Sequence, residues 1–326
     1  MQSGGVGSDF VVQLRNADRG FFRMTGRLPK GARVVLSWLP VLLACGLGTL
    51  GFYGMEVVLC YEQFYVGGFT RVGVTGALVF AIPFYLGMFS FIRTVFSDPG
   101  GVPESFALAY KDNRDLPEGR ESVDIGCLSG LQALNPSQAT VEVPRGPRLT
   151  HCRLCDKVRP PRSHHCRQCG RCILEMDHHC PVVRNCVGKR NYKYFVLILI
   201  HCSLGCAVGL CLALFWLFHR EQLPLLPWWK ELLLKGGMMM GASYTLLLGA
   251  YTLFHFWMIR EGIRTLDAIA LGIRKLLLGS SLSHFPFPQE DPHPFLTVFG
   301  KSPLLWLIPV YTSLGDGCAL DDKNSK

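Results

Sequence analysis

The chain has 326 residues, 49% of them hydrophobic, and its mean hydropathy of +0.25 is too high for an ordinary soluble domain. The charged fraction of 17% nevertheless predicts a sizeable aqueous part. The formal net charge is +9, but the basic residues flank the apolar segments, at Arg33, Arg93, Lys193 and Arg260, so we expect membrane lipid as a partner and no nucleic acid.

Residues 1–33 form a basic arm without a periodic apolar pattern. Four apolar segments follow, each long enough to cross roughly 30 Å of hydrocarbon. They contain no Asp, Glu, Lys or Arg and are Val34–Tyr53, Val72–Ile92, Tyr194–Phe218 and Gly237–Ile259. Buried helices of a large soluble core are the disfavoured alternative, since four such runs rarely coincide outside membranes. The sequence predicts an α-helical polytopic membrane protein, with transmembrane helices 1 and 2 in residues 34–92 and helices 3 and 4 in residues 194–259.

Lysine and arginine are distributed unevenly among the connections. They are frequent before the first span and in the long connection from Arg93 to Lys193, and fewer in the other two loops. Because positive residues stay on the cytosolic side, both termini and the long connection are predicted to be cytosolic. We expect an integral, multi-pass protein of an endomembrane, the Golgi or the ER.

The long connection begins with a linker, residues 93–149, in which the turn sequence Ser97-Asp98-Pro99-Gly100-Gly101 ends the second span. Residues 150–193 then carry the chemistry. Their cysteines and histidines include Cys152, Cys155, His165, Cys166, Cys169, Cys172, His178, His179, Cys180 and Cys186. Two C-x2-C pairs with further Cys and His nearby have the spacing of tetrahedral zinc sites, and a reducing cytosol keeps such thiols free. Because Pro160 and Pro161 exclude a helix, we expect loops and short hairpins.

The number of candidate ligands distinguishes metal binding from catalysis. Seven cysteines exceed the needs of one four-coordinate site and fit two. If each site takes three cysteines and one histidine, one cysteine and some histidines remain. A thiol beside an imidazole can act as a nucleophile, and the remaining pair would be His178 and Cys180, with Asp177 placed to orient the ring. A purely structural zinc module for protein contact is the open alternative.

The C-terminal tail, residues 260–326, begins with apolar residues at helical spacing. They are Ile263, Leu266, Ala270, Ile273 and Leu277, and they predict an amphipathic helix in the membrane interface. Farther on, Val298-Phe299-Gly300 and Trp306 to Pro309 could dock onto the membrane or onto the cysteine module. Three histidines lie in or near the spans, His201, His219 and His255, and we favour neutral, hydrogen-bonded roles for them over proton transfer.

Several short motifs occur together in the cysteine-rich segment. They are Cys152-x2-Cys155, Arg159-Pro160-Pro161-Arg162, His165-Cys166-x2-Cys169-x2-Cys172, Asp177-His178-His179-Cys180-Pro181 and Asn185-Cys186-x-Gly188-x2-Asn191. In this combination they resemble the DHHC-type (zinc finger DHHC domain) protein S-acyltransferases, the palmitoyltransferases. Asp98-Pro99-Gly100 also stands where that family has its DPG motif.

The resemblance implies two structural zinc ions. One would be held by Cys152, Cys155, His165 and Cys172, and the other by Cys166, Cys169, His179 and Cys186. It also implies Cys180 as the nucleophile, His178 as its base and Asp177 as the orienting acid. The implied co-substrate is a long-chain acyl-CoA, palmitoyl-CoA above all. The acyl group would pass through an acyl-Cys180 intermediate, at the cytosolic membrane face, to cysteine thiols of target proteins near the membrane.

The chain also departs from the family pattern at several positions. Val182 stands where the family has tryptophan, and Arg184 replaces a smaller polar residue. The TTxE motif is reduced to Arg264-Thr265-Leu266-Asp267, and Pro294 replaces an asparagine. These departures leave a catalytically weakened zinc-containing membrane adaptor of the same fold as the alternative, and a zinc-dependent ubiquitin ligase as a third, less favoured class.

Overall fold

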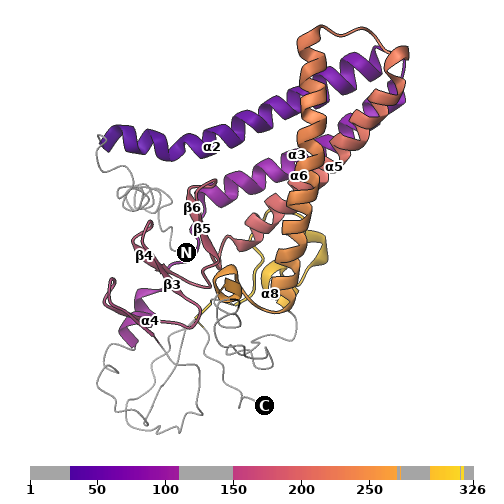
Figure 1. Cartoon of the computed structure of the whole chain (residues 1–326). Coiled ribbons are helices and arrows are strands. Elements are labelled where there is room, and N and C mark those ends of the chain that lie inside the picture. Colours follow the sequence, from indigo (N-terminus) through magenta and orange to yellow (C-terminus); the bar gives the residue numbers. More distant parts are fainter. Residues whose placement is uncertain (1–29, 110–149, 270–271, 273–293, 316, 319–326) are drawn as a thin grey trace, which may run out of the picture.

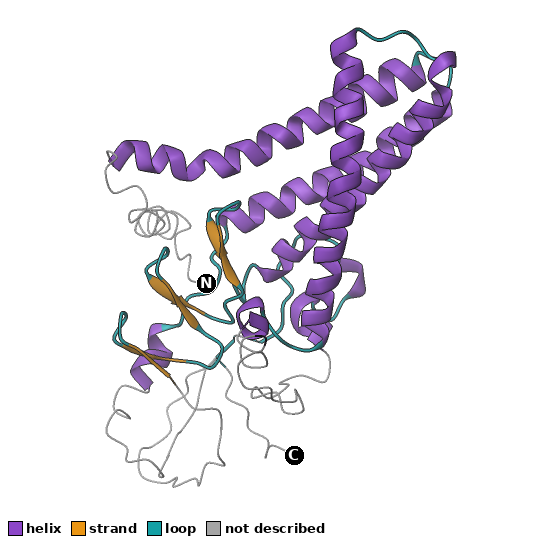
Figure 2. Ribbon diagram, in the orientation of Figure 1, coloured by secondary structure: helices purple, strands orange, loops and turns teal. Residues whose placement is uncertain are grey.

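The structure is a computed structural model that describes residues 30–109, 150–269, 272, 294–315 and 317–318 (Figure 1). The predictions for the N-terminal arm before residue 30, for most of the linker and for Ala270, Ile273 and Leu277 lie outside the described residues. Within the described residues the chain is mainly helical, with three small hairpins at one end of the long helices (Figure 2).

Four long helical stretches are apolar enough to cross a membrane, so the expected polytopic fold is confirmed. They are α2 (Lys30–Phe52), which continues as the π-helical η1 (Tyr53–Tyr65), then α3 (Thr70–Phe96), α5 (Tyr192–His219) and α6 (Trp228–Arg260). Large apolar side chains such as Leu78 and Leu246 remain exposed on their outer surfaces, where lipid would cover them.

The helices extend beyond the uncharged segments that the sequence defines. The first continues through Glu62, and the fourth begins at Trp228 and passes Glu231 and Lys235. These charges are paired: Lys230 Nζ lies 2.6 Å from Glu62 Oε1, and Lys235 Nζ lies 2.8 Å from Glu231 Oε1. A helix can continue through such pairs at the end of a span, so an absence of charge marks the apolar centre of a helix rather than its ends.

Residues 150–187, ahead of α5, fold as three antiparallel hairpins, in agreement with the loops and short hairpins expected for the cysteine-rich segment. They pair β1 (Thr150–Cys152) with β2 (Lys157–Arg159), β3 (His164–Cys166) with β4 (Arg171–Ile173), and β5 (His178–Cys180) with β6 (Asn185–Val187). Their turns contain Asp156, Gly170 and Arg184, each at positive φ, which is how three-residue strands reverse so tightly. An ion pair between Lys157 and Glu104 connects β2 to α4 (Glu104–Ala109).

Side-chain amides and carboxylates attach this module to the membrane helices. Asn185 Nδ2 donates to the carbonyl oxygens of Thr94 (3.0 Å) and Ser97 (2.8 Å), which α3 leaves unpaired at its C-terminus. In the turn after α3, Asp98 Oδ1 accepts from Arg171 Nη2 at 2.7 Å. The β5–β6 hairpin is therefore fixed between the end of α3 and the start of α5.

The C-terminal tail docks on α5. It contains α8 (Pro294–Phe299) and η4 (Pro303–Leu305), and the short η3 (Arg220–Gln222) lies in the α5–α6 connection. Lys193 Nζ donates to Leu305 O (2.8 Å), Val310 O (3.1 Å) and Thr312 Oγ1 (2.7 Å). Farther along α5, His201 Nε2 lies 3.0 Å from Leu307 O. The tail thus follows a membrane helix over about two turns.

The other two histidines near the spans also have hydrogen-bond partners. His219 Nδ1 lies 2.9 Å from Phe215 O, and His255 Nδ1 lies 2.9 Å from the Tyr192 hydroxyl. These contacts agree with the structural roles favoured from the sequence. Ile263 is buried, and Leu266 packs against the cysteine-rich hairpins, so these two residues of the amphipathic segment face protein rather than lipid.

Candidate metal centres and catalytic site

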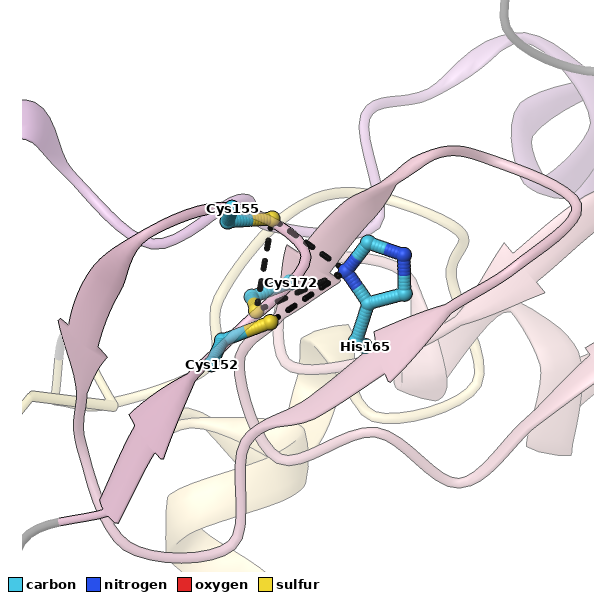
Figure 3. Close-up of side chains that lie close together, drawn as sticks. All are labelled: Cys152, Cys155, His165 and Cys172. Carbon is cyan, nitrogen blue, oxygen red and sulfur yellow. Dashed lines mark hydrogen bonds between the residues drawn. The ribbon is translucent and has the colours of Figure 1, made fainter.

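The first cysteine cluster gathers ligands from two hairpins (Figure 3). Cys152 and Cys155 come from the β1–β2 hairpin, and His165 and Cys172 face each other across β3 and β4. His165 Nδ1 lies 3.2 Å from Cys155 Sγ, 3.5 Å from Cys152 Sγ and 4.0 Å from Cys172 Sγ. The Sγ atoms of Cys155 and Cys172 are 3.8 Å apart. These four donors could hold one metal ion.

The second cluster shares the β3–β4 hairpin with the first and takes its other ligands from the β5–β6 hairpin. Cys166 and Cys169 belong to the β3–β4 hairpin, and His179 pairs with Cys186 across β5 and β6. His179 Nδ1 lies 3.5 Å from the sulfur of each of the three cysteines. This set is the second that could hold a metal ion.

Both donor sets fit Zn²⁺. Two sulfurs bound to the same zinc ion at about 2.3 Å and at the tetrahedral angle are ~3.8 Å apart. A sulfur and a histidine nitrogen bound to that ion are ~3.5 Å apart. The spacings in both clusters lie close to these values, and three thiols with one imidazole form a usual structural zinc site. The eight ligands implied by the family resemblance are the eight residues that the fold groups in this way.

Cys180 belongs to neither cluster. It is buried in an apolar cluster at the module ends of α3, α5 and α6, together with Val95, Phe195 and Ile259. Burial alone would raise the pKa of its thiol, but a hydrogen bond with His178 and backbone N–H groups of Val183 and Val182 outweigh burial and lower the pKa. The remaining thiol is therefore favoured as a thiolate in an apolar setting.

His178 lies between Cys180 and Asp177. Its Nδ1 is 2.7 Å from Asp177 Oδ2, and its ring packs edge-on against Phe195 at 5.1 Å between centroids. Burial would lower the pKa of His178, but hydrogen bonds with Asp177 and Cys180 raise it to about 9. Asp177 is fully buried, and although burial would raise its pKa, its bonds to His178 and to Thr265 N lower it. The three groups form an acid–imidazole–thiol array.

Thr265 contributes to this array, a role that sequence reasoning missed. Its backbone N donates to Asp177 Oδ1 at 2.9 Å, and its hydroxyl donates to Asp177 Oδ2 at 2.8 Å. It begins the short helix after α6, so its N–H is a first-turn donor without a partner inside that helix. The retained threonine of the reduced TTxE motif was the available signal, but no sequence pattern places it beside residue 177.

Two of the positions that depart from the family pattern, Val182 and Arg184, lie in the turn between β5 and β6. Val182 is exposed, and Arg184 extends toward α2, where its Nε donates to Ser37 Oγ at 2.7 Å and its guanidinium lies 4.6 Å from the centroid of the Trp38 ring. Arg184 therefore links the β5–β6 turn to the first membrane helix.

Comparisons with known proteins add evidence independent of this geometry. A family model described as "DHHC palmitoyltransferase" matches residues 146–271. The chain is 31% identical to Palmitoyltransferase ZDHHC15 of Xenopus laevis over 310 residues, which cover 89% of this chain and 84% of that protein. It is 29% identical to Palmitoyltransferase ZDHHC2 of Homo sapiens over 291 residues, 88% of this chain and 76% of the relative. Palmitoyltransferase ZDHHC20 of Mus musculus is 26% identical over 305 residues, with 87% and 77% covered.

Proposed function

The chain belongs to the DHHC palmitoyltransferases, a family of protein S-acyltransferases, and we propose that it carries out acyl transfer through a covalent intermediate on Cys180. The observation that carries this proposal is the thiol outside both metal clusters, hydrogen-bonded to a histidine that Asp177 orients. The same observation favours an enzyme over a non-catalytic adaptor, since an adaptor has no need of a thiol with a lowered pKa.

In the first step the Cys180 thiolate attacks the carbonyl carbon of a long-chain acyl-CoA. A new carbon–sulfur bond forms, the thioester bond to CoA breaks, and the proton held by His178 passes to the leaving CoA thiolate. Asp177 keeps the imidazole in the orientation in which its other nitrogen faces Cys180. The result is acyl-Cys180 and free CoA.

In the second step a cysteine thiol of a target protein enters. His178, now neutral, takes its proton, the new thiolate attacks the acyl carbon, and Cys180 leaves as a thiolate. The apolar residues around Cys180 support a fatty acyl donor, because each methylene that leaves water contributes about 0.8 kcal/mol. For the phosphates of CoA, Arg190 is exposed, whereas Lys189 and Arg162 are occupied in ion pairs with acidic residues.

Zinc in the two clusters would cross-link hairpins that are too short to fold alone, and it would have no part in acyl transfer. The distribution of basic residues supports a cytosolic location for the module and both termini, in an endomembrane of the Golgi or the ER. Acyl transfer would then take place at the cytosolic surface of that membrane.

Autoacylation tests the proposal. Purified full-length protein in detergent is incubated with labelled palmitoyl-CoA, and bound label is measured before and after treatment with hydroxylamine, which cleaves thioesters. We expect hydroxylamine-sensitive label on the wild-type chain and none on Cys180→Ser. The matched control is Cys211→Ser, at an exposed thiol of α5, which should keep the label. Equal labelling of the Cys180→Ser variant would refute the proposal.

A further inference from the structure

A buried carboxylate lies two residues before the proposed catalytic aspartate, between two cations. Glu175 Oε1 is 2.7 Å from Lys189 Nζ, and Glu175 Oε2 is 2.6 Å from Arg264 Nη2. The three side chains are 9%, 4% and 7% exposed. Burial would raise the pKa of Glu175, but the two cations hold it well below its usual range. This is therefore a fully charged network in the interior and not a surface ion pair.

The backbone of Glu175 is strained. Its φ is +41°, in the left-handed region that is unfavourable for a residue with a Cβ. Glycine would adopt this conformation at little cost, and asparagine at less than most residues. Glutamate has no conformational advantage at this position. We therefore attribute its role to the carboxylate, which binds both Lys189 and Arg264, two residues far apart in the sequence.

The two cations lie just outside the membrane helices that flank the site. Lys189 precedes α5, and Arg264 follows α6. Arg264 and its neighbour Thr265 both bind residues just before strand β5. Arg264 donates to Glu175, and Thr265 donates twice to Asp177. One dipeptide after α6 thus fixes two alternate residues of the segment that leads into β5.

The same guanidinium also contacts the aromatic side of the site. Arg264 lies 4.0 Å from the centroid of the Tyr192 ring, and the Tyr192 hydroxyl is 2.9 Å from His255 Nδ1. His255 packs edge-on against Phe195 at 5.4 Å between centroids, and Phe195 is the ring that contacts His178. Arg264 therefore supports His178 from two directions, through Glu175 and Asp177 and through the aromatic rings.

We propose that Arg264 and Glu175 are positioning residues that hold Asp177, and through it His178, in the geometry for proton transfer with Cys180. The proposal rests on the function proposed above. It gives the departure from the TTxE pattern at Arg264 a physical meaning, because the arginine has its own buried partner in this chain. Asp267 supports the arrangement, since its Oδ2 accepts from the backbone N of Arg264 at 3.0 Å.

A purely stabilising role makes a different prediction. Replacing a whole buried ion-pair network with apolar side chains of similar volume is often neutral or favourable for stability, whereas removing one partner leaves a buried unpaired charge. A triple variant, Glu175→Leu with Lys189→Met and Arg264→Met, therefore separates positioning from stability. If the network only stabilises the fold, a folded triple variant should undergo autoacylation at the wild-type rate.

The test uses full-length protein in detergent. Zinc per chain and melting temperature report on the fold. The single-turnover autoacylation rate at saturating palmitoyl-CoA, and the palmitoyl-CoA concentration that gives half of that rate, report on the reaction. We expect the triple variant to keep the zinc content, melting temperature and half-saturating concentration of the wild type, while its rate falls at least tenfold. A matched control, Glu62→Leu with Lys230→Met, removes an ion pair that lies outside the site and should keep the rate.

A triple variant that keeps its zinc and acylates at the wild-type rate overturns the proposal. If the triple variant is recovered without zinc, Glu175→Gln with Arg264→Gln replaces it, because the amide side chains can still form hydrogen bonds but carry no charge. We expect a smaller rate loss at unchanged half-saturation, and an unchanged rate overturns the proposal. Failure of the proposed function itself is distinct, since Cys180→Ser would then label as the wild type does.

Discussion

At the scale of single residues, reactivity depends on one hydrogen-bonded array. The hydrogen bond to His178 lowers the pKa of Cys180, and the bonds of His178 to Asp177 and Cys180 raise the pKa of the imidazole to about 9. A thiolate–imidazolium pair therefore forms once the pH exceeds the lowered pKa of Cys180, and it persists until His178 loses its proton near pH 9. Within this window the proposed nucleophile, Cys180, would need no further proton transfer before it attacks.

Asp177→Asn tests this electrostatic arrangement. The change removes a negative charge that raises the pKa of His178, so the imidazolium loses stability and the pKa of Cys180 rises. We expect the midpoint for alkylation of Cys180 by iodoacetamide, followed by mass spectrometry across the pH range, to move upward by about one unit or more, since one unit is ~1.4 kcal/mol. The control is the exposed Asp156→Asn. An unmoved midpoint would show that Asp177 does not tune the thiol.

Much of this array could be predicted from the sequence because its members are close neighbours in the chain. Counting ligands left one thiol over, and His178 and Asp177 lie within three residues of Cys180. Thr265 and Arg264 could not be placed in the same way, since their contacts with Asp177 and Glu175 join residues almost ninety positions apart. Only the packing of α6 against α5 brings them together.

At the scale of elements, the middle hairpin connects the two metal clusters. The β3–β4 hairpin gives His165 and Cys172 to the first cluster and Cys166 and Cys169 to the second, whereas β1–β2 serves only the first. The C-x2-C spacings predicted metal sites, but spacing alone did not show which ligands share a site. That assignment depends on strand register, which sets His165 opposite Cys172 and His179 opposite Cys186.

This arrangement predicts unequal effects of ligand removal. Cys152→Ser affects only the first hairpin and should leave close to one zinc ion per chain. Cys172→Ser disturbs a hairpin that carries ligands of both clusters, so we expect close to none. Metal analysis of the purified variants, with Cys211→Ser as the control for a thiol outside the clusters, measures the difference. Equal zinc content in the Cys152 and Cys172 variants would contradict the connecting role of the middle hairpin.

At the scale of the whole molecule, the tail after α8 is part of the folded structure. The ammonium group of Lys193 satisfies three acceptors of this tail, and His201 lies against a fourth, the carbonyl of Leu307. The apolar runs predicted the four membrane helices, but the contact between the tail and α5 depends on backbone carbonyl groups, which every residue carries. Backbone acceptors leave no pattern in a sequence, and the docking site therefore stayed an open alternative.

Lys193→Met measures the contribution of this docking. The variant leaves two carbonyl groups and a hydroxyl without their buried donor, at a cost on the order of 1–3 kcal/mol per unsatisfied group. We expect a melting temperature lower by several degrees and faster proteolysis within the tail. The control Lys301→Met removes an exposed lysine of the same tail and should change neither. Wild-type behaviour of Lys193→Met would mean that the tail is held by other contacts.

The bond between Thr265 and Asp177 also has a consequence for biosynthesis. The two residues are 88 positions apart, so a ribosome completes the cysteine-rich segment well before it adds the threonine. A nascent chain that ends before α6 already contains the residues of both cysteine–histidine clusters and the thiol of Cys180, yet it lacks the two Thr265 donors to Asp177. We therefore expect acyl transfer to begin only after residue 265, just past α6, has been added, and a chain whose translation stops before that point to be inactive.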